Sequence, residues 1–265
     1  MNKLHEKDKP FFMLDTHAGE GTYSLTDQDV IAKRDELAFK KTLALKGQSS
    51  LLDDYINIVE SYVNQGLYPG SPAVLLAKKR PQDTVHLNEL AQKMVQELRN
   101  FAQRDAHIHQ RDGFEALAAL MPPTPRRGLV LIDPPYENAT EYGAVEKAIF
   151  SAIKKWPNGI FLIWYPLLAD KRIDKNSDVV SVAKAGLSQA MVDELTSFHN
   201  QPTFSIELLN TPAECNAGMY GSGVLIINPP YQLADNLEQM LAILDKNVVE
   251  NGQGLSKLVW HRTAA

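Results

Sequence analysis

The sequence predicts an α/β fold built on a mostly parallel sheet. Short apolar runs alternate along the chain with segments whose apolar residues recur at helical spacing. Two of these runs, 128–132 and 160–166, are apolar almost throughout, which is typical of central strands that are covered on both faces. An earlier run ends at Asp15 and enters a glycine-containing turn at 16–21, the kind of strand end at which open α/β sheets bind ligands.

The amino-terminal half supplies further elements in the order that such a sheet requires. The stretches "TVHLNEL" (84–90) and "AHIHQRDG" (106–113) are short strands that lead into acidic residues, and the segment between them, 90–104, has helical spacing. "RGLVLIDPPY" (127–136) is a central strand, and residues 142–156 are expected to form the helix that follows it.

One region interrupts this alternation. Residues 28–67 are mostly helical in pattern, with one segment that ends at Gly47 and a second that begins after serines and ends at Gly66. A dinucleotide-type fold places its second strand about 30 residues after the first, much earlier than this chain does. We therefore predict an inserted helical subdomain at 28–67 and a main domain that comprises 1–27 and 68–265.

The carboxyl-terminal part predicts an antiparallel pair of strands. After a polar stretch, 170–186, to which the sequence assigns no role, a helix is expected near 188–199. "TFSIELLN" (203–210) and "SGVLIINPP" (222–230) are strands, and the link "AGMYGSG" (217–223) is short enough for a hairpin, which makes them antiparallel. The last expected elements are an amphipathic helix and a closing or edge strand, at 233–250 and 255–263.

Composition excludes several classes of protein. The formal charge of −5 argues against a surface coated in basic residues for non-specific nucleic-acid binding, and the single cysteine, Cys215, excludes an internal disulfide and a cysteine-rich metal site. The charged amino terminus is unlike a signal peptide, and the most apolar window is about half a membrane span long, so we expect a cytoplasmic protein. The net charge does not exclude a local basic rim, and the candidates are residues 77–80, 125–128 and 170–175.

The same short motif follows two of the expected strands. Asp133–Tyr136 reads Asp-Pro-Pro-Tyr, and Asn228–Tyr231 reads Asn-Pro-Pro-Tyr. The first should end a parallel strand and lie near the glycine turn at 16–21, at the edge where such sheets bind ligands. The second follows the antiparallel strand, so its carboxyl end should point to the opposite edge. We therefore interpret Asn228–Tyr231 as a structural strand terminator.

The first copy has the groups that methylation of an amino group requires. The exocyclic amine of a nucleobase has a delocalised lone pair and needs hydrogen-bond acceptors while a methyl group arrives in line. Asp133 supplies a carboxylate, and the carbonyl of Pro134 supplies a second acceptor. Tyr136 offers an aromatic face on which a flipped-out base can stack. These three residues are the predicted catalytic set.

Five stretches together resemble the bacterial family that methylates N6 of an adenine in 23S ribosomal RNA, the RNA of the large subunit. They are "EKDKPFFMLDTHAGEGTY" (6–23), "YINIVESYVNQGLYPGSP" (55–72), "PRRGLVLIDPPYE" (125–137), "LIWYP" (162–166) and "GMYGSGVLIINPP" (218–230). The resemblance implies a Rossmann-like class I methyltransferase with a mostly parallel, seven-stranded sheet. It also implies S-adenosyl-L-methionine as the cofactor and Asp133 as the proton acceptor.

The resemblance assigns cofactor contacts to five residues. His17 and Ser71 are expected to contact the cofactor, and Ser71 is also expected to cap a helix. Glu89 is expected to bind the ribose hydroxyls. Asp112 and Gly113 are expected to contact the adenine of the cofactor. No metal ion is expected, because the histidines lack metal-ligand spacing.

The family also sets expectations about the chain's start and its substrate. Family members begin with a further segment rich in His, Tyr and Lys, so the resemblance implies that an amino-terminal segment is missing here. The expected partner is large-subunit ribosomal RNA, and the net negative charge favours an unstructured or protein-free segment of it. We predict that the helical insertion and the loop at 214–223 bind this RNA and that the protein is a monomer. Three alternatives remain: a DNA adenine methyltransferase, an Asn/Gln side-chain methyltransferase of proteins, or a cofactor- or RNA-binding module without turnover.

Overall fold

The structure, a computed structural model, describes residues 1–25, 36–173, 178–210, 217–248 and 256–263. Two compact units make up the chain, Met1–Val130 and Leu131–Ala265. Strand β6 (Gly128–Ile132) begins in the first unit and ends in the second. The fold is of the Rossmann-like α/β class that the sequence predicts, with a mixed sheet and helices between the strands.

The first unit contains the parallel strands. Strand β1 (Phe12–Asp15) pairs in parallel with β4 (Thr84–Glu89), and β4 pairs in parallel with β5 (His107–Gln110). The strand order in this unit is β6-β1-β4-β5. Every residue of β1 is buried, which agrees with its unbroken apolar sequence up to Asp15. The remaining elements of this unit are α1 (Asn2–His5), β2 (Thr22–Ser24), α3 (Glu36–Leu43), α4 (Ser50–Val63), β3 (Leu67–Pro69), α5 (Ser71–Ala77), α6 (Gln92–Ala102) and α7 (Gly113–Leu120).

Helices α3 and α4 correspond to the expected insertion. Strands β2 and β3 flank this region in the sequence and pair with each other as an antiparallel ribbon, in which Thr22 lies opposite Pro69. Residues 26–35 lie outside the described part of the chain. The ribbon supports the assignment of 28–67 as a separate subdomain, which stays a prediction.

The second unit contains the antiparallel strands. Its strand order is β11-β9-β10-β7-β6, and β8 pairs with the end of β7. Strand β10 pairs in antiparallel fashion with both β7 and β9, as the sequence predicts for the strand that carries the second motif. The bounds of these elements are α8 (Thr140–Lys155), β7 (Ile160–Ile173), β8 (Val179–Ser181), α9 (Leu187–Phe198), β9 (Thr203–Leu209), β10 (Ala217–Ile227), α10 (Leu233–Asn247) and β11 (Lys257–Arg262).

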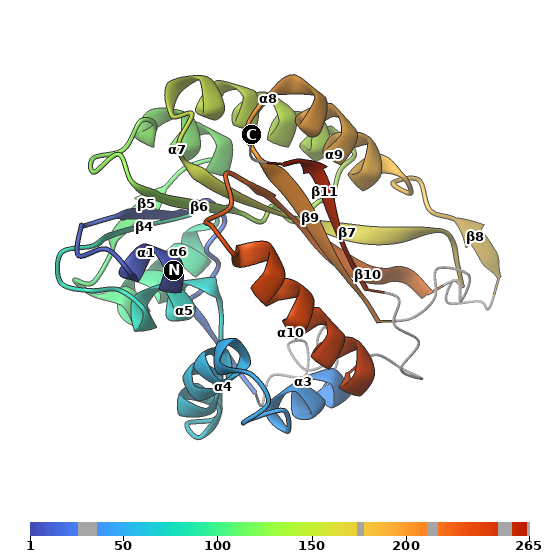
Figure 1. Ribbon diagram of the computed structural model, residues 1–265, viewed down its shortest axis with the longest axis horizontal. Helices are drawn as coiled ribbons and strands as arrows, with labels where there is room; N and C mark the ends of the chain where they lie inside the picture. The colour runs from blue at the N-terminus through green and yellow to red at the C-terminus, as the bar shows by residue number, and fades with distance from the viewer. Residues whose placement is uncertain (26–35, 174–177, 211–216, 249–255, 264–265) are drawn as a thin grey trace. The chain divides into compact units, whose positions relative to one another are not determined.

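Helix packing in the second unit follows the apolar pattern of the sequence. Helices α8 and α9 pack on each other, and α10 lies along β9 and β10 (Figure 1). The core beneath α10 is built on Phe204, Ile226 and Ala234. These residues come from β9, β10 and α10, so the helix closes the core of the antiparallel pair.

Two expectations about this unit were wrong in detail. "AGMYGSG" is not the hairpin link, because Ala217–Gly223 lie within β10 and pair with neighbouring strands. The polar residues from 170 onward continue β7 as far as Ile173, and β8 returns alongside it as a short hairpin arm. Strand β8 is therefore an element that the sequence did not predict, whereas β11 corresponds to the edge strand expected at 255–263.

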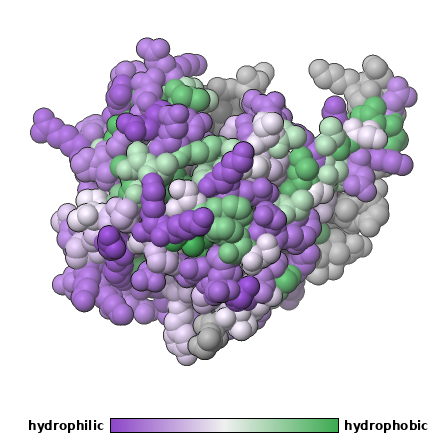
Figure 2. Space-filling model, turned by 90° about the horizontal axis from the view of Figure 1, so that it is seen from above, coloured by the Kyte–Doolittle hydropathy of each residue, from purple (hydrophilic) through white to green (hydrophobic). Residues whose placement is uncertain are grey.

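The surface is mainly hydrophilic on the face that Figure 2 shows, with smaller groups of hydrophobic residues among the polar ones. Within the described residues, none of the helices combines the length and the apolar character that a bilayer span requires.

Candidate active site

The carboxyl ends of β1 and β4 form the first part of the site. These strands are parallel and in register, with Asp15 opposite Leu87, so their ends lie at the same edge. Glu89 ends β4 and accepts a 3.0 Å hydrogen bond from the backbone amide of Gly19 through Oε2. Its Oε1 accepts hydrogen bonds of 2.8 Å from the amides of Leu90 and Ala91. The carboxylate is thus fixed beside the glycine turn, and it keeps lone pairs for a further donor such as a hydroxyl.

His17 and Gly113 lie against each other within this site. A Cβ atom placed on Gly113 would come within 2.5 Å of Cε1 and 2.6 Å of Nε2 of His17, so only glycine fits there. The hydroxyl oxygen of Thr16 lies 2.8 Å from Nδ1 of His17. Burial lowers the pKa of His17 and outweighs the charges of Asp112 and Glu89, which raise it. The surroundings of this half-buried imidazole therefore favour its neutral form.

Asp112 has a structural role in addition to its predicted one. Its Oδ1 accepts hydrogen bonds from the amides of Phe114 (2.9 Å) and Glu115 (3.1 Å), so it is the N-cap of α7. This capping places Asp112 and Gly113 next to His17. Their contact with the cofactor's adenine stays a prediction.

Asn88 is a site residue that the sequence did not single out. It is fully buried, and its Nδ2 donates to the carbonyls of Thr16 (2.9 Å) and Arg111 (3.0 Å). It therefore joins the loop after β1 to the loop after β5. The available signal was a polar side chain that directly precedes Glu89 at a strand end.

Ser71 does not cap a helix as expected. Gly70 is the N-cap of α5, Ser71 is the first helical residue, and no side-chain capping bond forms. The amide of Gly70 donates to the carbonyl of Gly21 at 2.9 Å, which brings the start of α5 to the glycine turn. The structure thus groups His17, Ser71, Glu89, Asp112 and Gly113 around the turn that follows β1.

Asp133 begins the predicted catalytic motif in the second unit. It directly follows β6, and the residue is exposed to solvent. Burial nevertheless raises the pKa of its carboxyl group from 3.8 to about 6. The two observations describe different sides of the residue: solvent reaches part of its surface, while protein atoms surround enough of the carboxyl group to disfavour its charge. The expected proximity of Asp133 to the glycine turn stays a prediction.

Tyr136 is not openly available as a stacking platform. It is 2% exposed, and its ring packs on Tyr142 and Trp164 at centroid distances of 4.6 and 6.1 Å. Its hydroxyl donates to the carbonyl of Trp164 at 2.8 Å. Stacking a base on this ring requires the neighbours to move, so that role stays a prediction. Pro134, the other member of the predicted set, is also buried.

The second motif has the structural role that the sequence predicts. Ile227, at the end of β10, pairs with Phe161 near the start of β7, so the motif lies at the amino end of β7. The Nδ2 of Asn228 donates to the carbonyls of Pro157 (2.7 Å) and Gly159 (2.8 Å). Asn228 thus fixes the turn between α8 and β7.

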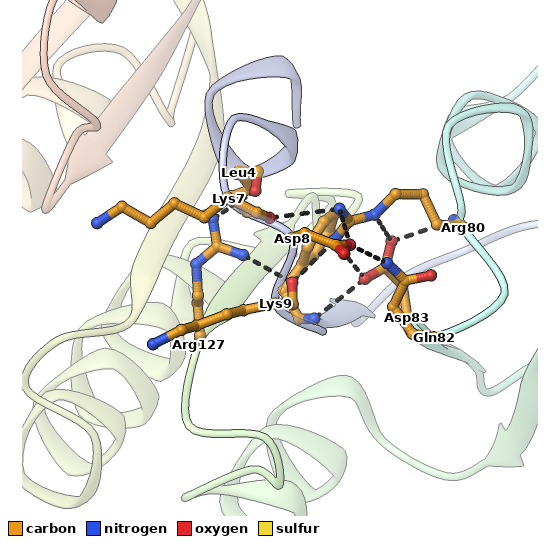
Figure 3. A network of polar contacts seen from close by, with 9 residues as sticks. Leu4, Lys7, Asp8, Lys9, Arg80, Gln82, Asp83 and Arg127 are labelled. Atoms are coloured by element: carbon orange, nitrogen blue, oxygen red, sulfur yellow. Dashed lines mark hydrogen bonds and ion pairs between the residues drawn. The ribbon is translucent and has the colours of Figure 1, made fainter.

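Two of the candidate basic rims are occupied by internal contacts. Arg80 forms an ion pair with Asp83 at 2.9 Å and donates to the carbonyls of Lys7 (3.3 Å) and Lys9 (2.8 Å). Arg127 donates to the same Lys9 carbonyl at 3.0 Å (Figure 3). These arginines hold the amino-terminal segment, so their guanidinium groups are not free for RNA. In the rim 77–80, Lys78 forms an ion pair with Asp54 at 2.8 Å, and Lys79 forms one with Asp105 at 3.9 Å.

The third rim differs from these. Lys171 and Arg172, in the part of β7 that pairs with β8, are both exposed. Neither forms an ion pair with any residue that the structure describes. Side-chain clusters suited to a metal ion are likewise absent from the described parts of the chain.

The Rossmann-like fold, the glycine turn with its acidic neighbours in the first unit and the Asp-Pro-Pro-Tyr motif in the second unit are typical of S-adenosylmethionine-dependent methyltransferases. Residues 8–262 match the family model described as "Ribosomal RNA large subunit methyltransferase D, RlmJ", and the chain belongs to this family. It is therefore a methyltransferase of ribosomal RNA.

Three known proteins are similar to this chain in sequence or structure over nearly its whole length. It is 35% identical to "Ribosomal RNA large subunit methyltransferase J" of Escherichia coli (strain K12), over 98% of this chain and 90% of that protein. It is 33% identical to the protein of the same name in Haemophilus influenzae, with the same coverage. A crystal structure of a Legionella pneumophila protein matches with a TM-score of 0.81 and 29% identity, over 99% of this chain and 92% of that one.

These comparisons do not bear out the expectation of a missing amino-terminal segment. The alignments to both relatives take in 98% of this chain and 90% of each relative.

Proposed function

We propose that Asp133 is the hydrogen-bond acceptor for the N6 amino group of an adenine in large-subunit ribosomal RNA while this nitrogen is methylated. In this reaction the amino nitrogen would take the methyl group from the sulfonium of the cofactor, whose carbon–sulfur bond would break, and Asp133 would accept the proton that the nitrogen loses. The observation that carries the proposal is the position of Asp133 directly after β6, with a carboxyl pKa of about 6. Such a group is mostly ionised at neutral pH and is a stronger base than an ordinary aspartate.

The cofactor site is proposed at the turn after β1. Gly113 leaves no room for a side chain next to His17, and Glu89 is fixed with lone pairs to spare, so these residues fit a nucleoside with free ribose hydroxyls. When bound, the cofactor supplies the methyl group. In this scheme Glu89 holds the ribose, Asp112 and Gly113 border the adenine, and His17 and Ser71 contact the remainder.

Substrate recognition is proposed to use the hairpin arm formed by the end of β7 and β8. Its residues Lys171 and Arg172 are exposed and form no ion pair with any described residue, whereas Arg80 and Arg127 of the other two rims bind the amino-terminal segment. Two phosphate contacts suit an unstructured or protein-free RNA segment better than a clamped duplex. The helical insertion remains a second proposed contact, whereas much of the loop at 214–223 lies within β10 or outside the described residues. We further propose that the protein acts as a monomer in the cytoplasm.

The test is methyl transfer from labelled cofactor to protein-free large-subunit RNA that lacks the modification. Wild-type protein is expected to label one adenine at N6, and Asp133→Ala is expected to bind the cofactor without labelling the RNA. Equal labelling by both proteins would refute the role of Asp133. A parallel panel of DNA and of peptides with Asn or Gln tests the other substrate classes, and cofactor binding without turnover on any of them would favour a binding module.

A further inference from the structure

We propose that Lys184 is a positioning residue for the motif Asp133–Tyr136, an inference that rests on the proposed role of Asp133. The ammonium group of Lys184 donates hydrogen bonds to the backbone carbonyls of Tyr136 and of Glu137, the latter at 3.2 Å. These are the last carbonyl of the motif and the one that follows it. Lys184 thus holds the main chain at the point where the motif leaves the site.

The conformation of Tyr136 explains why its main chain needs such a partner. Its φ angle is +49°, in the left-handed region that a residue with a Cβ atom rarely adopts. The side chain is held at its hydroxyl by the carbonyl of Trp164, at 2.8 Å. The hydrogen bond from Lys184 holds the backbone of the same residue. With only one of these two contacts, the peptide could still rotate about the contact that remains. The two contacts together fix the course of the main chain that follows Asp133.

Lys184 is itself fixed by its neighbours. The amide of Val182 donates to the carbonyl of Asp170 at 2.9 Å, and the hydroxyl of Ser188 donates to the carbonyl of Pro166 at 2.6 Å. The turn that contains Lys184 is therefore bonded to β7 on both sides. Strand β7 also carries Trp164, so both supports of Tyr136 depend on one strand. This arrangement gives the stretch 170–186 a role that its sequence did not reveal.

Lys184 is expected to act through geometry rather than through its charge on Asp133. Burial is the cause of the raised pKa of Asp133, and no charged side chain among the described residues contributes to the shift. Removal of the ammonium group should therefore leave the pH midpoint of catalysis unchanged and lower the maximal rate. A residue that tuned the charge of Asp133 would instead shift the midpoint.

The experiment measures single-turnover methylation at saturating RNA and cofactor. Lys184→Met is expected to be slower than wild type by about tenfold or more, since small misplacements of reacting groups strongly reduce rates. Lys184→Arg and Lys184→Gln, which keep a donor, should recover part of the rate. Cofactor affinity by calorimetry and the pH midpoint should match wild type. Lys246→Met is the matched control, because Lys246 is an exposed lysine of α10 in the same unit, and it should leave the rate unchanged.

Two results would overturn the inference. The first is a single-turnover rate in Lys184→Met that equals the wild-type rate. The second is a rate in folded Lys184→Arg and Lys184→Gln that is about tenfold or more below wild type, because these variants keep a donor; this second result decides the question even if Lys184→Met does not fold. Asp133→Asn in the same assay separates this inference from the proposed function. If Asp133→Asn is inactive while Lys184→Met is normal, only the role of Lys184 fails, whereas an active Asp133→Asn removes the proposed function itself.

Discussion

Asp133–Tyr136 and Asn228–Tyr231 differ in sequence at one position, yet their surroundings have almost nothing in common. The first follows β6, carries a carboxyl group with a pKa raised to about 6, and buries its tyrosine at 2% exposure. The second follows the antiparallel strand β10, turns its amide toward two backbone carbonyls, and leaves its tyrosine 83% exposed. The strand direction decides what a short motif does, because it decides at which edge of the sheet the motif lies.

The largest expected contrast is in the catalytic rate. Asp133→Asn should lower single-turnover methylation by about 10²–10⁴-fold, because an amide is a far weaker base than a carboxylate. Asn228→Asp should leave the rate of the folded protein near that of wild type. A comparable loss of rate in both variants, with cofactor binding intact, would end the distinction between the two motifs.

The pH dependence of the rate should report on Asp133 alone. Because burial raises its carboxyl pKa to about 6, the single-turnover rate should fall as the pH drops below this value, by about tenfold per unit. The residual rate of Asp133→Asn should not show this midpoint. A flat wild-type profile between pH 5 and 8 would contradict the assignment.

The same shift predicts that stability depends on pH with the opposite sign to that of an aspartate whose pKa is lowered by folding. The carboxyl pKa is 3.8 in the reference state and about 6 in the fold, so the folded protein binds more protons in this interval. Stability from this group therefore falls as the pH rises from about 4 to 6. In Asp133→Asn, urea unfolding across this range should lack that component.

Asn228 should matter for stability. Asn228→Asp replaces a donor to the carbonyls of Pro157 and Gly159 by an acceptor, which should lower the free energy of unfolding by about 1–3 kcal/mol. Chemical denaturation at pH 7 measures this difference. Asn228→Ser, which retains a single donor, serves as the control and should have an intermediate effect.

The two tyrosines offer the smallest and sharpest contrast. Tyr136→Phe removes the hydroxyl that donates to the Trp164 carbonyl and should lower the free energy of unfolding by about 1 kcal/mol. Tyr231→Phe, at an exposed position, should stay within about 0.5 kcal/mol of wild type. Equal effects in denaturation experiments would show that burial does not separate the motifs.

The sequence predicted the parts of the molecule that depend on local pattern. The apolar run before Asp133 identified β6, and the antiparallel direction of β10 followed from the proximity of two strands in the sequence. The strands that precede Glu89 and Asp112 were recognisable from their local pattern, whereas the cofactor roles of both residues came from the family resemblance and stay predictions. These features are encoded within a few residues of one another.

Features that depend on distant contacts were not predictable in the same way. The burial of Tyr136 depends on Trp164 and Tyr142, which lie on other elements. Arg80 and Arg127 resemble RNA-binding residues in the sequence, but they bind carbonyls of the amino-terminal segment, whose position the local pattern does not reveal. The continuation of β7 into polar residues was missed because its partner there, β8, has only three residues.

The ribbon of β2 and β3 has a consequence for how this fold can vary. Because Ser24 pairs with Leu67, the points at which the chain departs from the main body and returns to it are neighbours. An inserted subdomain requires such neighbouring ends, so the prediction for 28–67 implies that this segment can differ in length among relatives while β1 and β4 keep their register. Exchanging the segment between relatives, and measuring whether the protein still folds, tests that prediction.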